Sequence, residues 1–483
     1  MNFKVVLKTL GIVLICEAFL MLPSLFVACL YRGTDIKAFL YSIAMCLVVG
    51  GLLALIKPVN SNIYAKDGFA IVALSWLLVS FFGTMPFYFS KSIPSFIDAF
   101  FETVSGFTTT GSSLLPNVEI FPKGILFWRS FTHWVGGMGV LVLTLAVLPT
   151  ASAKMFHVMK AESPGPSPDK IVPKLGQTAK ILYLIYFIMT IFLIVLLCAA
   201  GMPLYDACIH AFGTAGTGGF SNMNKSVGAY NNVYVDIILT VAMFMFSINI
   251  SLYYQLLKGN VKTVFKNDEL RFHVGIVITS IVLIAVNIHG KYFDSFLTSL
   301  RYSAFQVSSI VSTTGYATTD FNLWPTFSKA ILFFLMFLGG CAGSTAGAMK
   351  NIRVLLLLKN VKREMVHAIH PRSYNTVRIS GKAVDEKILS AVTLFFCAYM
   401  IIYVIAVLIV STDGFDMETT LSSVAATLGN VGPGFGLVGP TGNFSQFSSI
   451  SKIVFSIIMI IGRLEIFPLL LLFMPSFWKK VNI

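Results

Sequence analysis

The chain has 483 residues, of which 56% are hydrophobic and only 12% are charged, and its formal net charge at pH 7 is +14. So large an apolar fraction excludes a soluble globular protein, because surface-to-volume scaling would leave much of it in contact with water. The basic residues gather in alternate loops between apolar runs, which is typical of membrane proteins and argues against a nucleic-acid partner. We therefore expect a multi-pass chain in a lipid bilayer, with both termini in the cytoplasm.

Two apolar helices are predicted at the start of the chain, over residues 5–30 and 38–56. The first run is longer than the apolar region of a signal peptide, and no clear small-residue cleavage site follows it, so we expect it to be retained. Each run approaches the ~20 residues that cross a hydrocarbon core as a helix. Residues 1–62 are therefore assigned to an N-terminal two-helix preface.

One pattern then recurs four times: a long apolar helix, a shorter segment that ends in Thr, Ser and Gly, and another long helix. The short segments end in GFTTTGSS (106–113), GTAGTGGFS (213–221), IVSTTGYATT (310–319) and TLGNVGPGFG (427–436). If Gly111, Gly218, Gly315 and Gly432 are equivalent, their separations are 107, 97 and 117 residues. Such spacing indicates internal duplication, which is frequent in transport proteins. The repeats are assigned to residues 63–152, 153–262, 263–366 and 367–483.

The short segments are interpreted as re-entrant pore loops. Residues 95–107 have the apolar spacing of a helix but are too few to cross a bilayer. A glycine-rich, non-helical stretch at membrane depth is tolerated only where protein buries it or where it lines a watery cavity. The predicted fold is therefore an all-α polytopic membrane protein, with four tandem helix–pore-loop–helix repeats around one central pore.

The loop sequences predict a filter for a dehydrated cation, because rings of backbone carbonyls can replace the lost hydration oxygens. Glycine permits the left-handed backbone that such a stretch needs, and threonine hydroxyls add oxygens. A single such glycine would more simply mark a turn or a close helix contact, but four at matching places favour a filter. The fourth loop is less rich in hydroxyls and carries a proline, so we expect asymmetry. The predicted filter residues are Thr109, Thr110, Gly111, Thr217, Gly218, Thr313, Thr314, Gly315, Asn430, Val431 and Gly432.

Acidic residues precede three of the four glycines by similar distances: Asp98, Asp206 and Glu418. They either cap the short helices or, in addition, form an acidic outer vestibule that concentrates cations. The third repeat departs from this pattern and has Arg301 at the comparable place.

Other reactive side chains carry no such pattern. For His133, His210 and Glu102 we expect structural roles, because no spacing suggests a metal site or a proton relay. The cysteines are expected to be small buried hydrophobes rather than disulfides or metal ligands: Cys16, Cys29, Cys46, Cys198, Cys208, Cys341 and Cys397.

A glycine-rich run at residues 339–350 follows an apolar helix. Each glycine weakens a helix by about 1 kcal/mol, so the run predicts either a broken helix that blocks the pore below the filter or a small-residue packing face. Arg463 lies within another apolar run, where a charge usually faces a cavity or a partner. It is either anchored structurally or placed as an electrostatic barrier to cations. Glu465, two residues on, does not share its helix face.

Several motifs together resemble the Trk/Ktr/HKT superfamily of cation transporters and, within it, the bacterial TrkH-type potassium-uptake subunits. Besides the loops, they are the Trp128-Arg129-Ser130 run with Gly136-Gly137, the 339–347 run, and Gly462-Arg463-Leu464-Glu465. In this superfamily a glycine at the key place in all four loops goes with potassium selectivity, and a serine at that place in the first loop goes with sodium. Gly111 therefore implies potassium uptake. The implied potassium-binding residues are Thr110, Gly111, Thr217, Gly218, Thr314, Gly315, Val431 and Gly432.

The resemblance also implies a gate and partners. The implied intramembrane gating loop comprises Gly343, Ser344, Thr345, Ala346 and Gly347, and Arg463 would project beneath the filter beside it. A homodimer is implied, as is a cytosolic ring of nucleotide-binding regulatory subunits of the TrkA type, which would dock on the basic loops at 154–180, 258–271 and 359–387. Those loops could instead only orient the chain and contact anionic lipid. Nucleotide is expected only on the partner, no cofactor is expected to be bound covalently, and the location is the bacterial cytoplasmic (inner) membrane.

Two rival functions remain. A secondary transporter with alternating access could couple potassium to protons or sodium, as a symporter would. A membrane-embedded enzyme would need a cluster of acid, base or nucleophile in the apolar core, and the sequence shows neither a phosphate-binding G-x-x-x-x-G-K-[ST] loop nor an HExxH motif. The chain is therefore not expected to be an enzyme.

Overall fold

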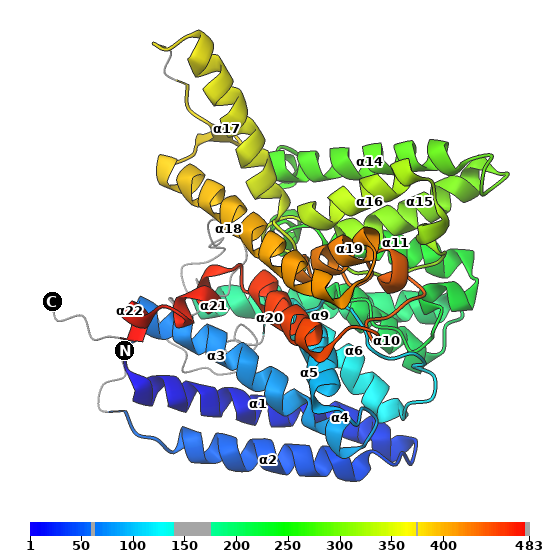
Figure 1. Ribbon diagram of the computed structural model, residues 1–483, viewed down its shortest axis with the longest axis vertical. Coiled ribbons are helices and arrows are strands. Elements are labelled where there is room, and N and C mark those ends of the chain that lie inside the picture. The colour runs from blue at the N-terminus through cyan, green and yellow to red at the C-terminus, as the bar shows by residue number, and fades with distance from the viewer. Residues whose placement is uncertain (59–62, 140–174, 373–374, 479–483) are drawn as a thin grey trace.

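The computed structural model describes residues 1–58, 63–139, 175–372 and 375–478. Within these residues the regular structure is helical apart from one two-stranded hairpin, β1 (Arg378–Ile379) and β2 (Lys382–Ala383) (Figure 1). The predicted all-α architecture is therefore confirmed. The expected boundaries at residues 62 and 152, and most of the basic segment 154–180, lie outside the described residues. The boundaries at 262 and 366 fall within short or exposed helices, so the division into residue ranges stays a prediction.

The preface consists of α1 (Phe3–Leu30) and α2 (Ile36–Ala54), which lie side by side (Figure 1). Gly11 and Gly50 let the two backbones approach closely. A Cβ added at Gly11 would lie 2.7 Å from the Gly50 carbonyl oxygen, and one added at Gly50 would lie 2.9 Å from that of Gly11. Small residues at helix contacts are the usual means of packing in lipid, where close van der Waals contact replaces the hydrophobic driving force. The predicted two-helix preface is confirmed.

Each repeat contains an outer helix, a short pore helix and a second outer helix. The first outer helices are α3 (Ala65–Gly83, extended by α4, Met85–Phe89), α9 (Leu175–Ala199), α14 (Asp268–Ile288) and α18 (Glu386–Val410). The pore helices are α5 (Phe96–Phe107), α10 (Leu204–Gly216), α15 (Phe296–Val311) and α19 (Met417–Leu428). The second outer helices are α6 (Lys123–Gly137), α11 (Val233–Phe246), α16 (Thr326–Leu338) and α20 (Ser449–Arg463).

The second outer helices α11, α16 and α20 are shorter than the sequence predicts, because each ends at a break in the described chain. Among the described helices six are long and apolar enough to cross a membrane, and the pair α11 and α12 (Ile250–Leu257), bent by 93°, would make a seventh. The second long helix predicted for the fourth repeat, in the apolar run that contains Arg463, is not continuous. Its chain breaks after Arg463, where Glu465 and Ile466 have φ of 55° and 71°, and resumes as α21 (Phe467–Leu472).

The remaining elements lie between or after the repeats. The short α13 (Val261–Phe265) precedes α14, α17 (Asn351–Ile369) projects from the body of the molecule, and α22 (Pro475–Trp478) ends the described chain (Figure 1). Within the described residues there are also four 3-10 turns: Ser226–Tyr230, Phe321–Leu323, Ser411–Asp413 and Gly436–Val438.

The four repeats close into a ring. The second outer helix of each repeat packs on the pore helix of the next: α6 on α10, α11 on α15, α16 on α19, and α20 on α5. The last contact joins the fourth repeat to the first. The structure therefore places all four pore helices around one centre, as the repeat pattern predicts.

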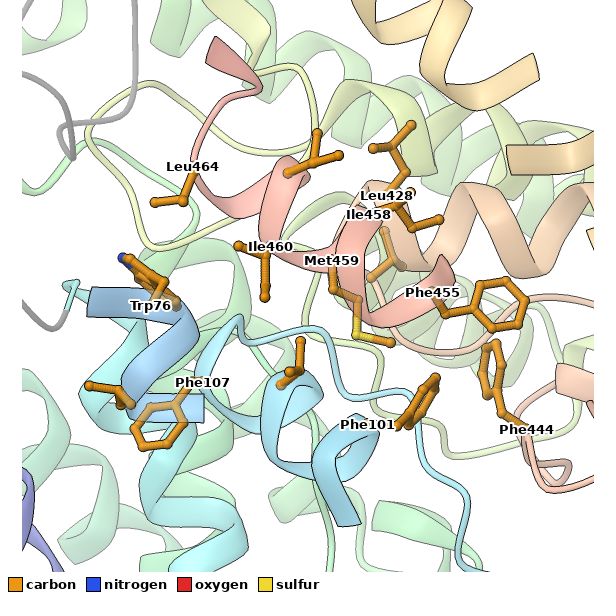
Figure 2. Close-up of a cluster of buried hydrophobic side chains, with 14 of the residues drawn as sticks. Trp76, Phe101, Phe107, Leu428, Phe444, Phe455, Ile458, Met459, Ile460 and Leu464 are labelled. Carbon is orange, nitrogen blue, oxygen red and sulfur yellow. The ribbon is translucent and has the colours of Figure 1, made fainter. Parts of the chain in front are cut away.

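Aromatic side chains fill the contact that closes this ring (Figure 2). Phe101 of α5 lies beside Phe444 and Phe455, with ring centroids 5.7 and 6.4 Å away. Phe444 and Phe455 meet edge to face at 5.4 Å. Such aromatic pairs contribute beyond their buried area, and in lipid this close packing is what holds helices together.

The seven cysteines are all free, as predicted, and no group of three or more His, Cys, Asp or Glu side chains among the described residues could hold a metal ion. Their expected burial is only partly correct. Cys46 and Cys341 are buried, but Cys29 and Cys397 lie on the protein surface, where the surrounding apolar runs predicted an interior position.

Candidate functional site

Each pore helix passes into its pore loop through the same hydrogen-bonded turn. In every repeat a backbone N–H just after the helix donates to a carbonyl five residues earlier, at 2.8–2.9 Å. The four pairs are Thr110 to Ser105, Gly218 to Gly213, Thr314 to Ser309, and Val431 to Ala426. The helix carbonyl ends, which carry partial negative charge, therefore point toward the centre at equivalent places.

Two backbone positions in each loop are left-handed. The first is occupied by Thr109, Thr217, Thr313 and Asn430, with φ between 53° and 58°. The second lies two residues later and is occupied by Gly111, Gly219, Gly315 and Gly432, with φ of 82°, 78°, 82° and 102°. Alternating left- and right-handed residues orient successive peptide groups the same way, so their carbonyls can face one side of the chain. Only glycine adopts such φ values without steric cost.

This geometry corrects the predicted equivalence of the second loop. Gly218 was matched to the other three glycines, but the left-handed residue at that position is Gly219. Gly218 instead occupies the place of Thr110. The segment Gly218-Gly219 offers two glycines and the sequence could not show which one takes the positive φ. Gly219 is thus a left-handed pore-loop residue that was not among the predicted ones.

The four loops touch one another in a closed cycle. A Cβ added at the left-handed glycine of any loop would strike a carbonyl oxygen of the following loop, and the fourth loop strikes the first. The contacts are Gly111 on Gly218 O at 1.9 Å, Gly219 on Thr314 O at 1.9 Å, Gly315 on Val431 O at 2.3 Å, and Gly432 on Thr110 O at 2.7 Å. The four carbonyls thus come from equivalent residues, and any side chain at these glycines would displace the ring.

An open cavity of about 150 Å³ lies against this ring. Its lining includes the left-handed glycine of every loop: Gly111, Gly219, Gly315 and Gly432. Gly111 and Gly432, which are more than 300 positions apart in the sequence, therefore line the same cavity.

Several loop hydroxyls are engaged within the protein. The Thr110 hydroxyl bonds to that of Thr108 at 2.8 Å and accepts the side-chain N–H of Asn430 at 2.9 Å. The Thr314 hydroxyl bonds likewise to that of Ser312 at 2.7 Å. Asn430 thus joins the fourth loop to the first through its side-chain amide. The other three loops have threonine at this position, and their shorter side chains make no such bond within the described residues. The predicted asymmetry is present in this contact.

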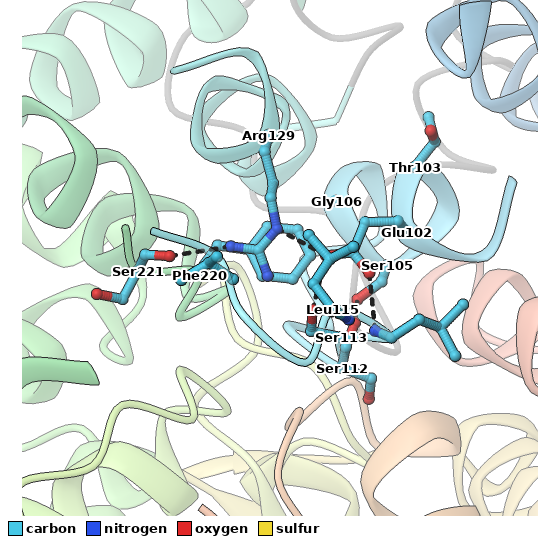
Figure 3. Close-up of polar contacts among 12 residues, drawn as sticks. Glu102, Thr103, Ser105, Gly106, Ser112, Ser113, Leu115, Arg129, Phe220 and Ser221 are labelled. Atoms are coloured by element: carbon cyan, nitrogen blue, oxygen red, sulfur yellow. Dashed lines mark hydrogen bonds and ion pairs between the residues drawn. The ribbon is translucent and has the colours of Figure 1, made fainter. Parts of the chain in front are cut away.

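A buried ion pair supports the first two loops (Figure 3). Arg129 of α6 pairs with Glu102 of α5 at 2.6 Å, and both side chains are buried. Arg129 also donates to the Ser221 carbonyl at 3.0 Å and lies over the ring of Phe220 at 3.5 Å. Glu102 accepts the backbone N–H of Leu114 at 3.0 Å. The expected structural role of Glu102 agrees with these contacts, but its partner could not be identified from the sequence.

His133 joins the same two loops. Its Nδ1 lies 2.7 Å from the Gly106 carbonyl, and its Nε2 accepts the Phe220 N–H at 3.2 Å. Because Nε2 accepts, the proton lies on Nδ1 and the ring is neutral in this arrangement. His210 bonds to the Asp206 carbonyl and the Ser221 hydroxyl. Both histidines therefore hold loop backbone, as the expected structural roles require.

Acidic side chains lie in the first turn of three pore helices, as predicted. Asp98 pairs with Lys452 of α20 at 2.8 Å, and Glu418 pairs with Lys329 of α16 at 2.6 Å. In both pairs the lysine belongs to the preceding repeat of the ring. Asp206 bonds instead to side chains of its own repeat. Of the two ion pairs, only Lys329–Glu418 has a largely exposed carboxylate, at 46%, and exposed pairs contribute only about 0–1 kcal/mol.

The third repeat reverses the charges. Arg301 of the pore helix lies 3.7 Å from Asp236 of α11, so the base is on the pore helix and the acid on the preceding repeat.

The fourth pore helix, α19, begins with a charged N-cap. The Thr419 hydroxyl donates to Asp416 at 2.6 Å and holds the pKa of that carboxyl below its ordinary value. Asp416 thus stays charged as the N-cap of this pore helix.

Residues 339–350, here called the inner loop, interrupt the chain between α16 and α17, as the broken-helix prediction requires. The Gly347 N–H donates to the Thr313 hydroxyl at 2.7 Å, and the Ala348 N–H donates to the Gly429 carbonyl at 2.9 Å. The inner loop therefore touches the bases of the third and fourth pore loops directly.

The break between α11 and α12 holds the other side of the inner loop. The Cys341 N–H donates to the Ser247 carbonyl at 2.8 Å, and the Ile250 N–H donates to the Gly343 carbonyl at 3.1 Å. Gly343 has a φ of 72°, and a Cβ there would lie 2.8 Å from Asn249 Oδ1. The close fit needs glycine at this position.

Arg463 lies beside the inner loop, as the resemblance implies. It donates to the Thr345 carbonyl at 2.7 Å and to those of Gly136 and Gly137 at 2.6 and 2.5 Å. Glu465 does not share its face but pairs with Arg353 of α17. Backbone carbonyls therefore hold the Arg463 guanidinium in place. These contacts are compatible both with a structural anchor and with an electrostatic barrier to cations.

Two residues of α14 that were not among the predicted site residues hold the inner loop at both ends. Glu269 Oε1 accepts the backbone N–H of Ala342 at 2.7 Å and that of Ile352 at 3.1 Å. His273 is buried and bonds to the Ser247 hydroxyl at 2.8 Å and to Asn351 at 2.7 Å. Their only sequence signal is an acid and a histidine one helical turn apart at the start of an apolar run.

Comparison with known proteins gives a consistent result. Residues 35–480 match the TrkH family, described as cation transport proteins. The chain is 37% identical to the Trk system potassium uptake protein TrkH of Salmonella typhimurium over 99% of this chain and 100% of that protein. It is 33% identical to the Trk system potassium uptake protein TrkG of Escherichia coli, over 99% of each. The crystal structure of the potassium transporter TrkH from Vibrio parahaemolyticus superposes with a TM-score of 0.89 at 34% identity, covering 99% of this chain and 100% of that one.

Proposed function

This chain belongs to the TrkH family of cation transport proteins, and we propose that it takes up potassium through the ring of four pore loops. The relatives named above are potassium uptake proteins, and they match along the whole chain. The observation that carries the proposal is the cyclic contact of the loops. Four glycines touch four carbonyls from equivalent residues, and all four glycines line one cavity.

In this proposal the carbonyl oxygens replace the hydration shell of potassium. Thr110, Gly218, Thr314 and Val431 supply one ring of oxygens, and the left-handed glycines supply the next, on the side of the cavity. The C-terminal ends of the pore helices add partial negative charge beneath them. No side chain needs to ionise for the ion to bind, which suits a weakly held ion that must also leave.

The inner loop is proposed as the gate. Its Gly347 and Ala348 bond to the bases of two pore loops, so a cation leaving the filter would meet the loop first. Arg463 bonds to the same loop and adds a positive charge beneath the filter. The arrangement supports a closed pore that opens when the inner loop moves away from Thr313 and Gly429.

Regulation is proposed to come from cytosolic partners. The relatives belong to a Trk system, which supports a TrkA-type regulatory ring that binds nucleotide. The projecting helix α17 and the hairpin β1–β2 carry basic residues and would offer it a surface (Figure 1). A homodimer, cytoplasmic termini and a place in the bacterial inner membrane complete the proposal, and no covalently bound cofactor is required. Like its relatives, the chain would act as a transporter rather than an enzyme.

One observation favours a second candidate, coupling of potassium to protons. Glu17 of α1 is almost fully buried, and neither of its carboxylate oxygens has a hydrogen-bond partner among the described residues. A carboxyl within a membrane helix is costly and is often functional, because it can carry a proton. Coupled uptake would make potassium flux follow an imposed pH gradient, and Glu17→Gln would abolish that dependence.

The experiment for the main proposal measures potassium and sodium flux in liposomes that contain the purified chain, with and without the regulatory subunits of its own system. We expect potassium to be preferred and the subunits to change the rate rather than the preference. Equal flux of both ions in every condition would contradict the proposal.

A further inference from the structure

A buried lysine ends the inner loop. Lys350 is only 3% exposed and directly precedes α17, which begins at Asn351. Its ammonium donates to the carbonyl of Ala346 and lies 3.5 Å from that of Ser344. Its backbone φ of 70° is left-handed, although it is not a glycine. Strained backbone of this kind persists where the surrounding structure imposes it, often in segments that switch.

Two cations together hold three successive carbonyls of the inner loop. Lys350 takes the carbonyls of Ser344 and Ala346, and Arg463 takes that of Thr345 between them at 2.7 Å. Lys350 and Arg463 also line one cavity of about 40 Å³, together with Gly347, which contacts the fourth pore loop. Backbone carbonyls are the groups that bind a dehydrated monovalent cation, and an ammonium is a compact single charge.

We propose that Lys350 is a tethered cation that occupies ion-binding carbonyls of the closed inner loop and repels the permeating ion. This inference rests on the proposed function and adds a second positive gate residue to Arg463. Like charges a few ångströms apart in a site of low dielectric oppose each other strongly, so an ion leaving the filter would be excluded while Lys350 stays in place.

The place of Lys350 in the chain supplies a way to release it. Asn351, the next residue, begins α17, whose far end is exposed and projects from the molecule (Figure 1). Arg353, one turn into this helix, pairs with Glu465, and Glu269 accepts the N–H of Ile352. These groups, with Arg463, are the charges that surround Lys350. A shift of α17 would therefore pull the ammonium away from its carbonyls.

A neutral hydrogen-bond donor separates this role from simple capping of the loop. Lys350→Gln keeps a donor but loses the charge, Lys350→Met loses both, and Lys350→Arg keeps both. Potassium flux of the purified chain in liposomes should rise about tenfold in the Gln and Met variants, as loss of a nearby like charge allows, and stay low in the Arg variant. Lys291→Gln, on an exposed surface away from the pore, is the matched control.

If Lys350→Gln stays as closed as wild type while Arg463→Ala conducts, the lysine only caps the loop and the inference is overturned. If no variant and no activated wild-type protein conducts potassium, the proposed function itself is wrong. A measurement on the wild-type chain does not depend on how variants fold. Reductive methylation, read by mass spectrometry, should spare Lys350 in the resting protein and modify it once the regulatory subunits activate flux. Equal modification in both states would also overturn the inference.

Discussion

The backbone N–H of Gly347 donates to the hydroxyl of Thr313 across 2.7 Å, and this bond joins the inner loop to the third pore loop. Thr313 is itself left-handed, with a φ of 58°, and it lies two residues before the left-handed Gly315 of the same pore loop. The element proposed as the gate is therefore bonded to a pore loop that is proposed to form part of the filter. This bond, together with that from Ala348 to the Gly429 carbonyl, couples the inner loop to the pore loops.

Removing that acceptor should favour the open pore. Thr313→Val keeps the shape of the side chain but cannot accept the Gly347 N–H, and a net hydrogen bond is worth about 1 kcal/mol. We expect basal potassium flux of the chain in liposomes to rise about fivefold, as 1.4 kcal/mol corresponds to about tenfold. Thr420→Val is the matched control, because the buried Thr420 hydroxyl of α19 has no hydrogen-bond partner within the described residues. A similar rise in both variants would count against a specific role of this bond.

The corrected position of Gly219 can be tested by substitution. A Cβ at Gly219 would lie 1.9 Å from the Thr314 carbonyl oxygen, and its φ is 78°. Gly219→Ala should therefore disrupt the filter and lose potassium preference or flux. Gly201→Ala is the control, since Gly201 also has a positive φ, of 91°, but meets nothing within 4 Å. It should show only the backbone cost of about 1–2 kcal/mol in thermal stability and normal selectivity. Normal selectivity in Gly219→Ala would indicate that Gly218, and not Gly219, is the functional equivalent of the glycines in the other three loops.

The buried pair Arg129–Glu102 should be important for stability. Removing one partner leaves the other charge buried and unpaired, which typically costs about 3–5 kcal/mol. We expect Glu102→Ala to lower the unfolding temperature in detergent far more than Glu418→Ala. Glu418 also pairs with a base at 2.6 Å, but its side chain is 46% exposed. Similar shifts for the two variants would show that the loops do not depend on the buried pair.

The contacts of Glu269 predict a further effect on gating. Its carboxylate accepts N–H groups on both sides of the inner loop, so Glu269→Ala should free both ends and raise basal flux. Glu269→Gln keeps an acceptor oxygen and should have a smaller effect, because only charge assistance is lost. Flux of the two variants and wild type can be compared in the same liposomes without regulatory subunits. If basal flux of Glu269→Ala stays as low as that of wild type, Glu269 does not help to keep the inner loop closed.

The sequence predicted the architecture because glycine and threonine clusters at membrane depth have few structural alternatives. It placed four pore helices and three acids in their first turns, and for residues 339–350 it left a broken helix and a small-residue packing face as alternatives. It could not choose between Gly218 and Gly219, since backbone handedness depends on contacts with the next loop. It also predicted continuous second outer helices, because apolar composition does not reveal the positive φ of Glu465 and Ile466.

Partners across the ring were beyond the sequence for a related reason. Arg129 and Glu102, or Glu269 and Ala342, meet only after the repeats have assembled. Nothing in their local spacing distinguishes them from other polar residues in apolar runs. The buried network that supports the pore loops thus follows from tertiary packing, whereas the glycine and threonine clusters of the loops can be read from the sequence.

The most direct test of the account is the selectivity of Gly111→Ser. The serine Cβ would press on the Gly218 carbonyl, 1.9 Å away, at a backbone φ of 82°, so one oxygen of the ring must move. Potassium and sodium flux should be measured in liposomes that contain only the purified chain, for wild type and variant at matched protein content. We expect a potassium preference in wild type that falls sharply in the variant while flux persists. An unchanged preference would contradict it, because the four glycines would then serve only to pack the loops.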